Sequence, residues 1–218
     1  MADFKKVTLA LAAAGLLSSG AVHAALHDRG GGLIYDDVFD ITWLADANYA
    51  QTSNYDSDGV MDFDEANTWA AGLSYGGYDD WRLPTALNQD GSGPCAGYNC
   101  SSSEMGHMFY NNLGATAGNS ILSGTNTANL ALFTHLQSHY YWFGTVWASY
   151  PDLGAWAFFS FRGSQSPSTQ INEFYAWAVH PGDVAAAIPE PETYAMLLAG
   201  LGLLGGVAKW RRQSFGAS

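Results

Sequence analysis

The chain has 218 residues and a formal net charge of −12 at pH 7, and 48% of its residues are hydrophobic. Residues 25–188 contain three arginines, no lysine and 17 acidic residues, so this segment carries a charge of −14. Such a charge makes nucleic acid and anionic lipid surfaces poor partners, while the apolar content is that of a folded chain and not of a disordered one.

The first 24 residues have the order of a secretory signal peptide. Lys5 and Lys6 form a basic start, and residues 7–17 form an apolar stretch too short to span a bilayer. Small residues then lead to Ala24, which favours cleavage before Ala25. The alternative is a buried N-terminal helix.

Residues 25–187 are predicted to form one domain of the α+β class, with short helices and a small antiparallel sheet. Two β-branched and aromatic runs, 33–35 and 41–44, predict a hairpin. The apolar spacing predicts helices over 65–73 and 105–113. Further along, the sequence predicts a long surface loop over 114–130, strands at 140–142, 155–159 and 174–179, and a turn over 162–172.

The acidic stretch 54–65 has the spacing of a calcium-binding loop. Gly59 stands at the sixth position for the sharp bend, Glu65 at the twelfth for bidentate ligation, and a predicted helix follows. Asn54 takes the first position, where aspartate is usual. An alternative, which is compatible with calcium, is that Asp62 or Asp64 caps the helix. The predicted ligands are Asn54, Asp56, Asp58, Val60, Asp62 and Glu65.

The two cysteines, Cys95 and Cys100, flank four residues in a loop rich in glycine and serine. In an exported protein such a pair predicts a disulfide. A zinc site is the alternative, but it would need two more ligands and only His107 is near in sequence.

Gly76–Thr85, with the sequence GGYDDWRLPT, combines a tryptophan with one of the few arginines of the domain. We predict that the guanidinium of Arg82 forms hydrogen bonds to carboxylates or carbonyl groups and so fixes the ends of chain segments in the core. The structural motif comprises Trp81, Arg82, Leu83 and Pro84, with ligand binding as the alternative.

Five tyrosine and tryptophan residues gather within 140–150. Strand alternation is expected to bury about half of them, and those left outside could stack on the faces of sugar rings. The members are Tyr140, Tyr141, Trp142, Trp147 and Tyr150.

The tail begins with a stiff acidic spacer, Pro189-Glu190-Pro191, followed by an apolar stretch and a basic end. This order over residues 188–213 resembles the PEP-CTERM sorting signal of Gram-negative bacteria, which exosortases process at Pro189, Glu190 and Pro191. The resemblance implies a transmembrane helix over about 193–210, passage through the inner membrane, and delivery to the cell surface or the extracellular matrix of a biofilm. A plain single-pass anchor is the alternative.

A second resemblance covers residues 32–184. It is carried by Gly32–Asp36, Ile41–Asn48, Gly76–Pro84, Tyr141–Trp142 and Tyr175–Asp183. These segments are similar to the Lcl C-terminal domain family, a former domain of unknown function. The family implies a C-type-lectin-like fold and non-catalytic binding of extracellular polysaccharide.

The chain departs from that family at two places. Phe143-Gly144 follows the tyrosine–tryptophan pair where relatives have small polar residues, and His180 stands where they have arginine. The missing arginine removes a fixed positive charge, which disfavours an anionic polymer at that position.

Together these patterns predict an exported, exosortase-sorted protein that binds polysaccharide without catalysing a reaction. Calcium is the one cofactor that the sequence suggests, and a protein without any cofactor is the alternative. A structural matrix component without a specific ligand and a carbohydrate-modifying enzyme are the alternatives. Catalytic motifs such as GxSxG and HExxH do not occur in the sequence.

Overall fold

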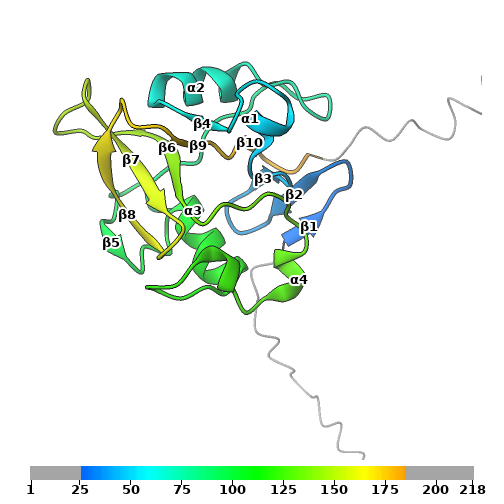
Figure 1. The fold of residues 1–218 in the computed structure, drawn as a ribbon. Coiled ribbons are helices and arrows are strands. Elements are labelled where there is room, and N and C mark those ends of the chain that lie inside the picture. Colours follow the sequence, from blue (N-terminus) through cyan, green and yellow to red (C-terminus); the bar gives the residue numbers. More distant parts are fainter. Residues whose placement is uncertain (1–25, 185–218) are drawn as a thin grey trace, which may run out of the picture.

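The computed structural model describes residues 26–184 (Figure 1). The predicted signal peptide 1–24 and the predicted sorting segment 188–213 lie outside the described residues. The strands are β1 (Leu26–Asp28), β2 (Leu33–Asp36), β3 (Ile41–Leu44), β4 (Val60–Met61), β5 (Gly97–Tyr98), β6 (Tyr140–Val146), β7 (Gly154–Phe159), β8 (Ser164–Thr169), β9 (Phe174–Tyr175) and β10 (Val179–Pro181). The helical segments are α1 (Tyr49–Thr52), α2 (Phe63–Ala71), α3 (Glu104–His107), η1 (Met108–Asn112), η2 (Ile121–Ser123) and α4 (Thr127–Leu130).

The strands form two sheets. One has the order β1-β2-β3-β10 and joins the two ends of the domain, because β10 pairs with β3 from 135 residues further along the chain (Figure 1). The other has the order β4-β9-β6-β7-β8-β5. The α+β class is confirmed. The expectation of one small antiparallel sheet is incomplete, since there are two sheets and β6 pairs with β9 in parallel.

The early hairpin forms as predicted. Leu33 faces Leu44 and Asp36 faces Ile41 across β2 and β3. The carboxylate of Asp36 accepts hydrogen bonds from the backbone N–H groups of Val38 and Phe39, at 3.0 and 3.4 Å, and so closes the turn locally.

The predicted helices are present with shifted ends. Helix α2 begins two residues before the predicted 65–73, because Asp62 caps it by accepting a hydrogen bond from Glu65 N at 2.9 Å. The predicted helix 105–113 is α3 continued by the π-helical turn η1, and the side chain of Ser103 caps α3.

Three segments differ from expectation. Residues 162–172 were predicted as a turn, but 164–169 form β8, which pairs with β7 from Gly154↔Thr169 to Phe159↔Ser164. The loop 114–130 contains two short helical turns, η2 and α4. The predicted strand 174–179 is divided between β9 and β10. In each case pairing or capping by neighbouring residues outweighs local composition.

Aromatic rings fill the space between the sheets. Trp43 lies against Trp177 with ring centroids 4.6 Å apart, and Trp142 lies against Phe174 at 4.5 Å. The indole N–H of Trp142 donates to the carbonyl of Met61 at 2.9 Å, which satisfies its polar atom within the core. Trp43 belongs to β3 of one sheet and Trp142 to β6 of the other, while Trp177 lies between β9 and β10, so the packing of these rings joins the two sheets.

Within 26–184 no helix has the length and apolar character that a membrane span requires. The predicted transmembrane segment 193–210 lies beyond the described residues.

Candidate functional site

The aromatic group predicted at 140–150 divides into a buried half and an exposed half. Tyr141 and Trp142 are fully buried in β6, and Tyr140 stacks on Phe174. Trp147 is only partly buried, and Tyr150 is 55% exposed. The residues free to meet a ligand are therefore those in the β6–β7 connection.

The β6–β7 connection folds back on itself and presents two rings side by side. The ring centroids of Trp147 and Tyr150 are 4.8 Å apart at an interplanar angle of 51°. The N–H of Trp147 donates to the carbonyl of Gly154 at 2.8 Å, and the N–H of Gly154 donates to Tyr150 O at 2.9 Å. A side chain at residue 154 would meet the Trp147 ring at 2.8 Å, so glycine is needed for this close packing.

The two rings border an apolar hollow of about 320 Å³. This volume is near the lower end of small-molecule sites, about 300–1,000 Å³. We call it the aromatic hollow. It is lined by Trp147, Tyr150, Leu153, Gly154, Pro167, Ser168 and Thr169.

A second hollow of about 350 Å³ adjoins the first and shares Leu153 and Thr169 with it. We call it the acidic hollow, because Asp62, Asp64 and Asp152 line it. Its remaining members are Leu153, Thr169, Gln170 and Ile171.

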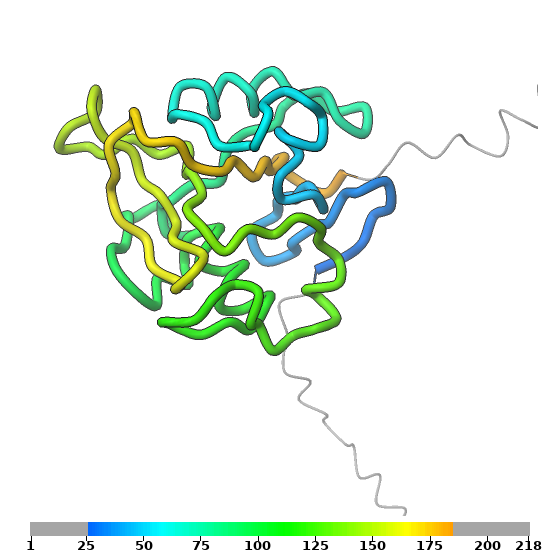
Figure 2. The backbone as a smooth tube through the Cα atoms, in the orientation of Figure 1, coloured from blue at the N-terminus to red at the C-terminus, as the bar shows by residue number. Residues whose placement is uncertain are grey.

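Three segments that are distant in sequence line the acidic hollow: the start of α2, the β6–β7 connection and the β8–β9 connection. Figures 1 and 2 show these segments close to one another. The N–H of Phe63 donates to Gln170 O at 3.0 Å, which ties α2 to the β8–β9 connection. The amide of Gln170 donates to the carbonyls of Pro151 and Gly154, at 2.9 and 3.2 Å. One glutamine thus fixes both neighbouring segments around the two hollows.

The carboxylates of the predicted calcium loop take part in its own turns. Asp56 accepts hydrogen bonds from the N–H groups of Asp58 and Gly59, at 3.0 and 2.6 Å. Partial burial opposes ionisation, but these backbone N–H groups hold the pKa of Asp56 below its ordinary value. Asp58 in turn accepts from the N–H of Val60 at 3.2 Å.

The bend at Gly59 has φ of +82°, as the predicted loop requires. Asn48 lies directly against it, so a side chain at residue 59 would collide with the Asn48 amide. Asn54 also has a positive φ of 60°, and Val60 lies in β4 paired with Tyr175.

Residues 26–184 contain no group of three or more histidine, cysteine, aspartate or glutamate side chains placed to hold a metal ion. Calcium binding by the loop 54–65 stays a prediction. The alternative was that Asp62 or Asp64 caps the following helix, and Asp62 is indeed the N-cap of α2.

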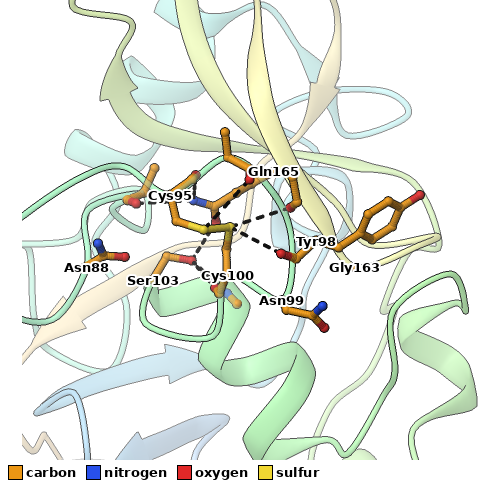
Figure 3. The surroundings of a disulfide bond; sticks show 12 residues. Asn88, Cys95, Tyr98, Asn99, Cys100, Ser103, Gly163 and Gln165 are labelled. Carbon is orange, nitrogen blue, oxygen red and sulfur yellow. Dashed lines mark hydrogen bonds between the residues drawn. A yellow bond between two sulfur atoms is a disulfide. The ribbon is translucent and has the colours of Figure 1, made fainter.

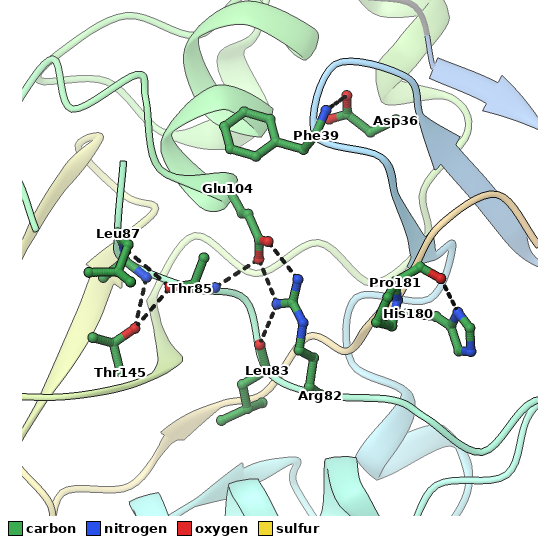
Figure 4. Close-up of polar contacts among 11 residues, drawn as sticks. Asp36, Phe39, Arg82, Leu83, Thr85, Leu87, Glu104, Thr145, His180 and Pro181 are labelled. Atoms are coloured by element: carbon green, nitrogen blue, oxygen red, sulfur yellow. Dashed lines mark hydrogen bonds and ion pairs between the residues drawn. The ribbon is translucent and has the colours of Figure 1, made fainter. Parts of the chain in front are cut away.

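The Trp81–Pro84 motif joins three segments; Trp81, Leu83 and Pro84 are buried, whereas the Arg82 side chain is partly exposed. Figure 4 shows Arg82 beside Glu104. The backbone of Arg82 pairs with Val179 through hydrogen bonds of 2.9 and 2.8 Å. Its guanidinium donates to both carboxylate oxygens of the buried Glu104, at 2.8 and 2.7 Å, and to the carbonyl of Leu83 at 3.0 Å. Glu104 also accepts from the N–H of Thr85 at 2.7 Å. These contacts support a structural function for Arg82.

Cys95 and Cys100 form a disulfide, so this prediction is confirmed and the zinc alternative is wrong (Figure 3). The loop is attached to β8 through Gln165, whose amide donates to the carbonyl of Cys95 at 2.6 Å and accepts from the hydroxyl of Ser103 at 2.7 Å. The disulfide thus braces the edge of the larger sheet.

Sequence reasoning missed the acidic side of the site. Trp147 and Tyr150 were singled out, but Asp152 and Asp64 were not connected to them. The available signal was Asp152, which stands two residues after Tyr150 in a short turn. Its proximity to Asp64 depends on the tertiary structure alone.

Residues 187–213 match the PEP-CTERM protein-sorting motif. This motif implies an exported protein that is sorted to the cell surface and processed by an exosortase. The sorting residues Pro189, Glu190 and Pro191 fall within the match.

No curated protein and no solved structure matches the chain. The similarity of residues 32–184 to the Lcl C-terminal domain family, and the lectin-like fold that it implies, therefore stay predictions.

Proposed function

We propose that this protein is a surface or extracellular-matrix protein that binds polysaccharide without catalysis, through the aromatic hollow. The observation that carries the proposal is the pair of rings, Trp147 and Tyr150, held 4.8 Å apart beside an apolar hollow. A partly exposed tryptophan and tyrosine provide large rigid apolar faces with polar edges, which suit the apolar faces and hydroxyl groups of sugar rings. The backbone hydrogen bonds that join Trp147 and Tyr150 to Gly154 hold the two rings in place before a ligand binds. This preorganisation lowers the entropic cost of binding.

The place of the hollow in the domain supports this function. Figures 1 and 2 show the β6–β7 connection at one end of the molecule and the end of the described chain, after β10, toward the other. The sorting motif follows β10 in sequence. In a protein anchored through that motif, the aromatic hollow would therefore face away from the point of attachment.

The export route agrees with the ligand class. A protein sorted to the cell surface meets extracellular polymers, and the charge of −14 over residues 25–188 disfavours nucleic acid. The similarity to the Lcl C-terminal domain family implies the same ligand class.

The test is affinity electrophoresis of the full-length protein, purified in mild detergent, through gels that contain a soluble glucan, a glucosamine polymer or alginate. We expect retardation by at least one polymer. Tyr150→Ala should weaken that binding about tenfold. Tyr55→Ala is the matched control, because Tyr55 is exposed to a similar degree, 49%, but does not line either hollow.

Circular dichroism of both variants checks that they remain folded. Absence of retardation by every polymer would overturn the proposal and favour a structural matrix component. Equal retardation of wild type and Tyr150→Ala would place any binding elsewhere.

A further inference from the structure

The aromatic and acidic hollows form one continuous surface with two different chemistries. They share Leu153 and Thr169, and Leu153 is 67% exposed between them. The carboxylates of the acidic hollow therefore line a surface that adjoins the one bordered by Trp147 and Tyr150.

The carboxylates of the acidic hollow have no cationic neighbour in the described part of the chain. None of the four ion pairs found within 26–184 involves Asp62, Asp64 or Asp152. The linings of both hollows contain no arginine, lysine or histidine. Three like charges on one small surface raise the local concentration of cations and disfavour anionic groups.

The positions of these charges are set by the fold. Asp62 is fixed as the N-cap of α2, and Asp64 stands in the first turn of the same helix. Asp152 is carried by the β6–β7 connection, which Gln170 holds through the carbonyls of Pro151 and Gly154. The negative charge thus lies at a defined place beside the aromatic rings.

We infer that the polysaccharide bound here carries free amino groups, as in a de-N-acetylated amino-sugar polymer. The inference rests on the proposed function and names its ligand class. A sugar face lies on the rings of Trp147 and Tyr150, and an ammonium group enters the acidic hollow. Charge complementarity selects this occupant over a neutral or acidic polymer. The negative faces of the two aromatic rings add to the attraction for the ammonium group.

The test compares two pentamers of equal length, one of glucosamine and one of N-acetylglucosamine. Isothermal titration calorimetry of the full-length protein is carried out at about pH 6, where an amine of ordinary pKa is protonated. We expect the glucosamine pentamer to bind at least tenfold more tightly. Raising the salt from about 50 to about 300 mM should weaken its binding and leave that of the acetylated pentamer unchanged.

The variants separate charge from stacking. Asp152→Asn and Asp64→Asn should each weaken binding of the glucosamine pentamer several-fold without affecting the acetylated one. Tyr150→Ala should weaken both. Asp80→Asn is the matched control, because Asp80 is exposed and lines neither hollow. It removes the same unit of charge and should leave binding unchanged.

Equal or tighter binding of the acetylated pentamer would overturn the inference while the proposed function stands. An equal effect of Asp80→Asn and Asp152→Asn would also overturn it, because only the overall charge would then matter. Oligolysine that binds as tightly as the glucosamine pentamer, with no loss in Tyr150→Ala, would point to a basic peptide instead. If neither pentamer binds while another polymer does, the inference is wrong. If no polymer binds, the proposed function fails as well.

Discussion

The guanidinium of Arg82 and the carboxylate of Glu104 meet through two hydrogen bonds, of 2.8 and 2.7 Å, although the residues are 22 positions apart. Glu104 is only 4% exposed and stands in the first turn of α3, whereas the Arg82 side chain is partly open to solvent. The pair joins the Trp81–Pro84 motif to the helix α3 and, through the backbone of Arg82, to β10.

Arg82→Met would leave the buried Glu104 carboxylate without its charged partner. We expect the free energy of unfolding to fall by about 2–3 kcal/mol, as urea denaturation measures it. The matched control is Arg29→Met. Arg29 also forms two hydrogen bonds to one carboxylate, that of Asp183, but this pair lies at the surface, so its loss should be much smaller. Equal losses would show that burial of Glu104 is not the cause.

The N-cap of α2 gives a prediction that does not depend on metal. Asp62→Ala removes the acceptor for Glu65 N and should lower the free energy of unfolding by about 1 kcal/mol. The loss is measured by thermal melts with chelator present, because Asp62 is also a predicted calcium ligand and bound calcium would add an effect of its own.

Calcium binding by the loop 54–65 is tested by thermal melts with calcium and with chelator. Millimolar calcium is expected to raise the melting temperature of the wild type, and Glu65→Ala should abolish that rise because it removes the bidentate position of the loop. Glu173→Ala is the control, since Glu173 is exposed and lies outside the loop. No effect of calcium on the wild type would leave the loop with its capping function alone.

His107 is buried beside the ring of Phe39, and its Nε2 atom has no hydrogen-bond partner. Burial lowers the pKa of this imidazole below its ordinary value of 6.5, and the nearby carboxylates of Asp36 and Asp37 only partly oppose the shift. Below pH 6.5 the unfolded chain therefore binds a proton that the folded chain resists. Stability should fall as the pH drops from 6.5 toward the folded-state pKa.

His107→Phe should remove this part of the pH dependence, because phenylalanine fills similar space and does not titrate. Urea midpoints at about pH 7.5 and about pH 5.5 give the comparison. His139→Phe, at an exposed position, should retain the wild-type fall. A His107→Phe variant with an unchanged fall would assign the acid sensitivity to other groups.

The disulfide closes a short loop, so its effect on the unfolded chain is limited. Replacing Cys95 and Cys100 by serine should lower the free energy of unfolding by about 2 kcal/mol. The change should also loosen the start of β8, because Gln165 binds the carbonyl of Cys95. Hydrogen exchange at Ser164 and Gln165 would report this, while β7 positions such as Phe158 should change less.

Local features could be predicted well from the sequence. The periodic apolar residues of α2, its acidic cap and the β2–β3 hairpin each depend on residues only a few positions apart. The disulfide belongs to the same class, since Cys95 and Cys100 are close in sequence. The sorting motif at 187–213 is read from the order of residues alone.

The tertiary structure decided the rest. The polar residues of β8 look like a turn until β7 pairs with them. Strand β6 buries Tyr141, Trp142 and Phe143 in succession, so both of its faces are covered there, while Tyr150 beyond it stays exposed. The acidic hollow exists because Asp64 and Asp152, 88 positions apart, are brought together by α2 and the β6–β7 connection. Short-range patterns record only the neighbours along the chain, whereas a binding surface is made by segments that meet when the core packs. The sequence therefore determined the export route and the local elements, and only folding determined which side chains share a site.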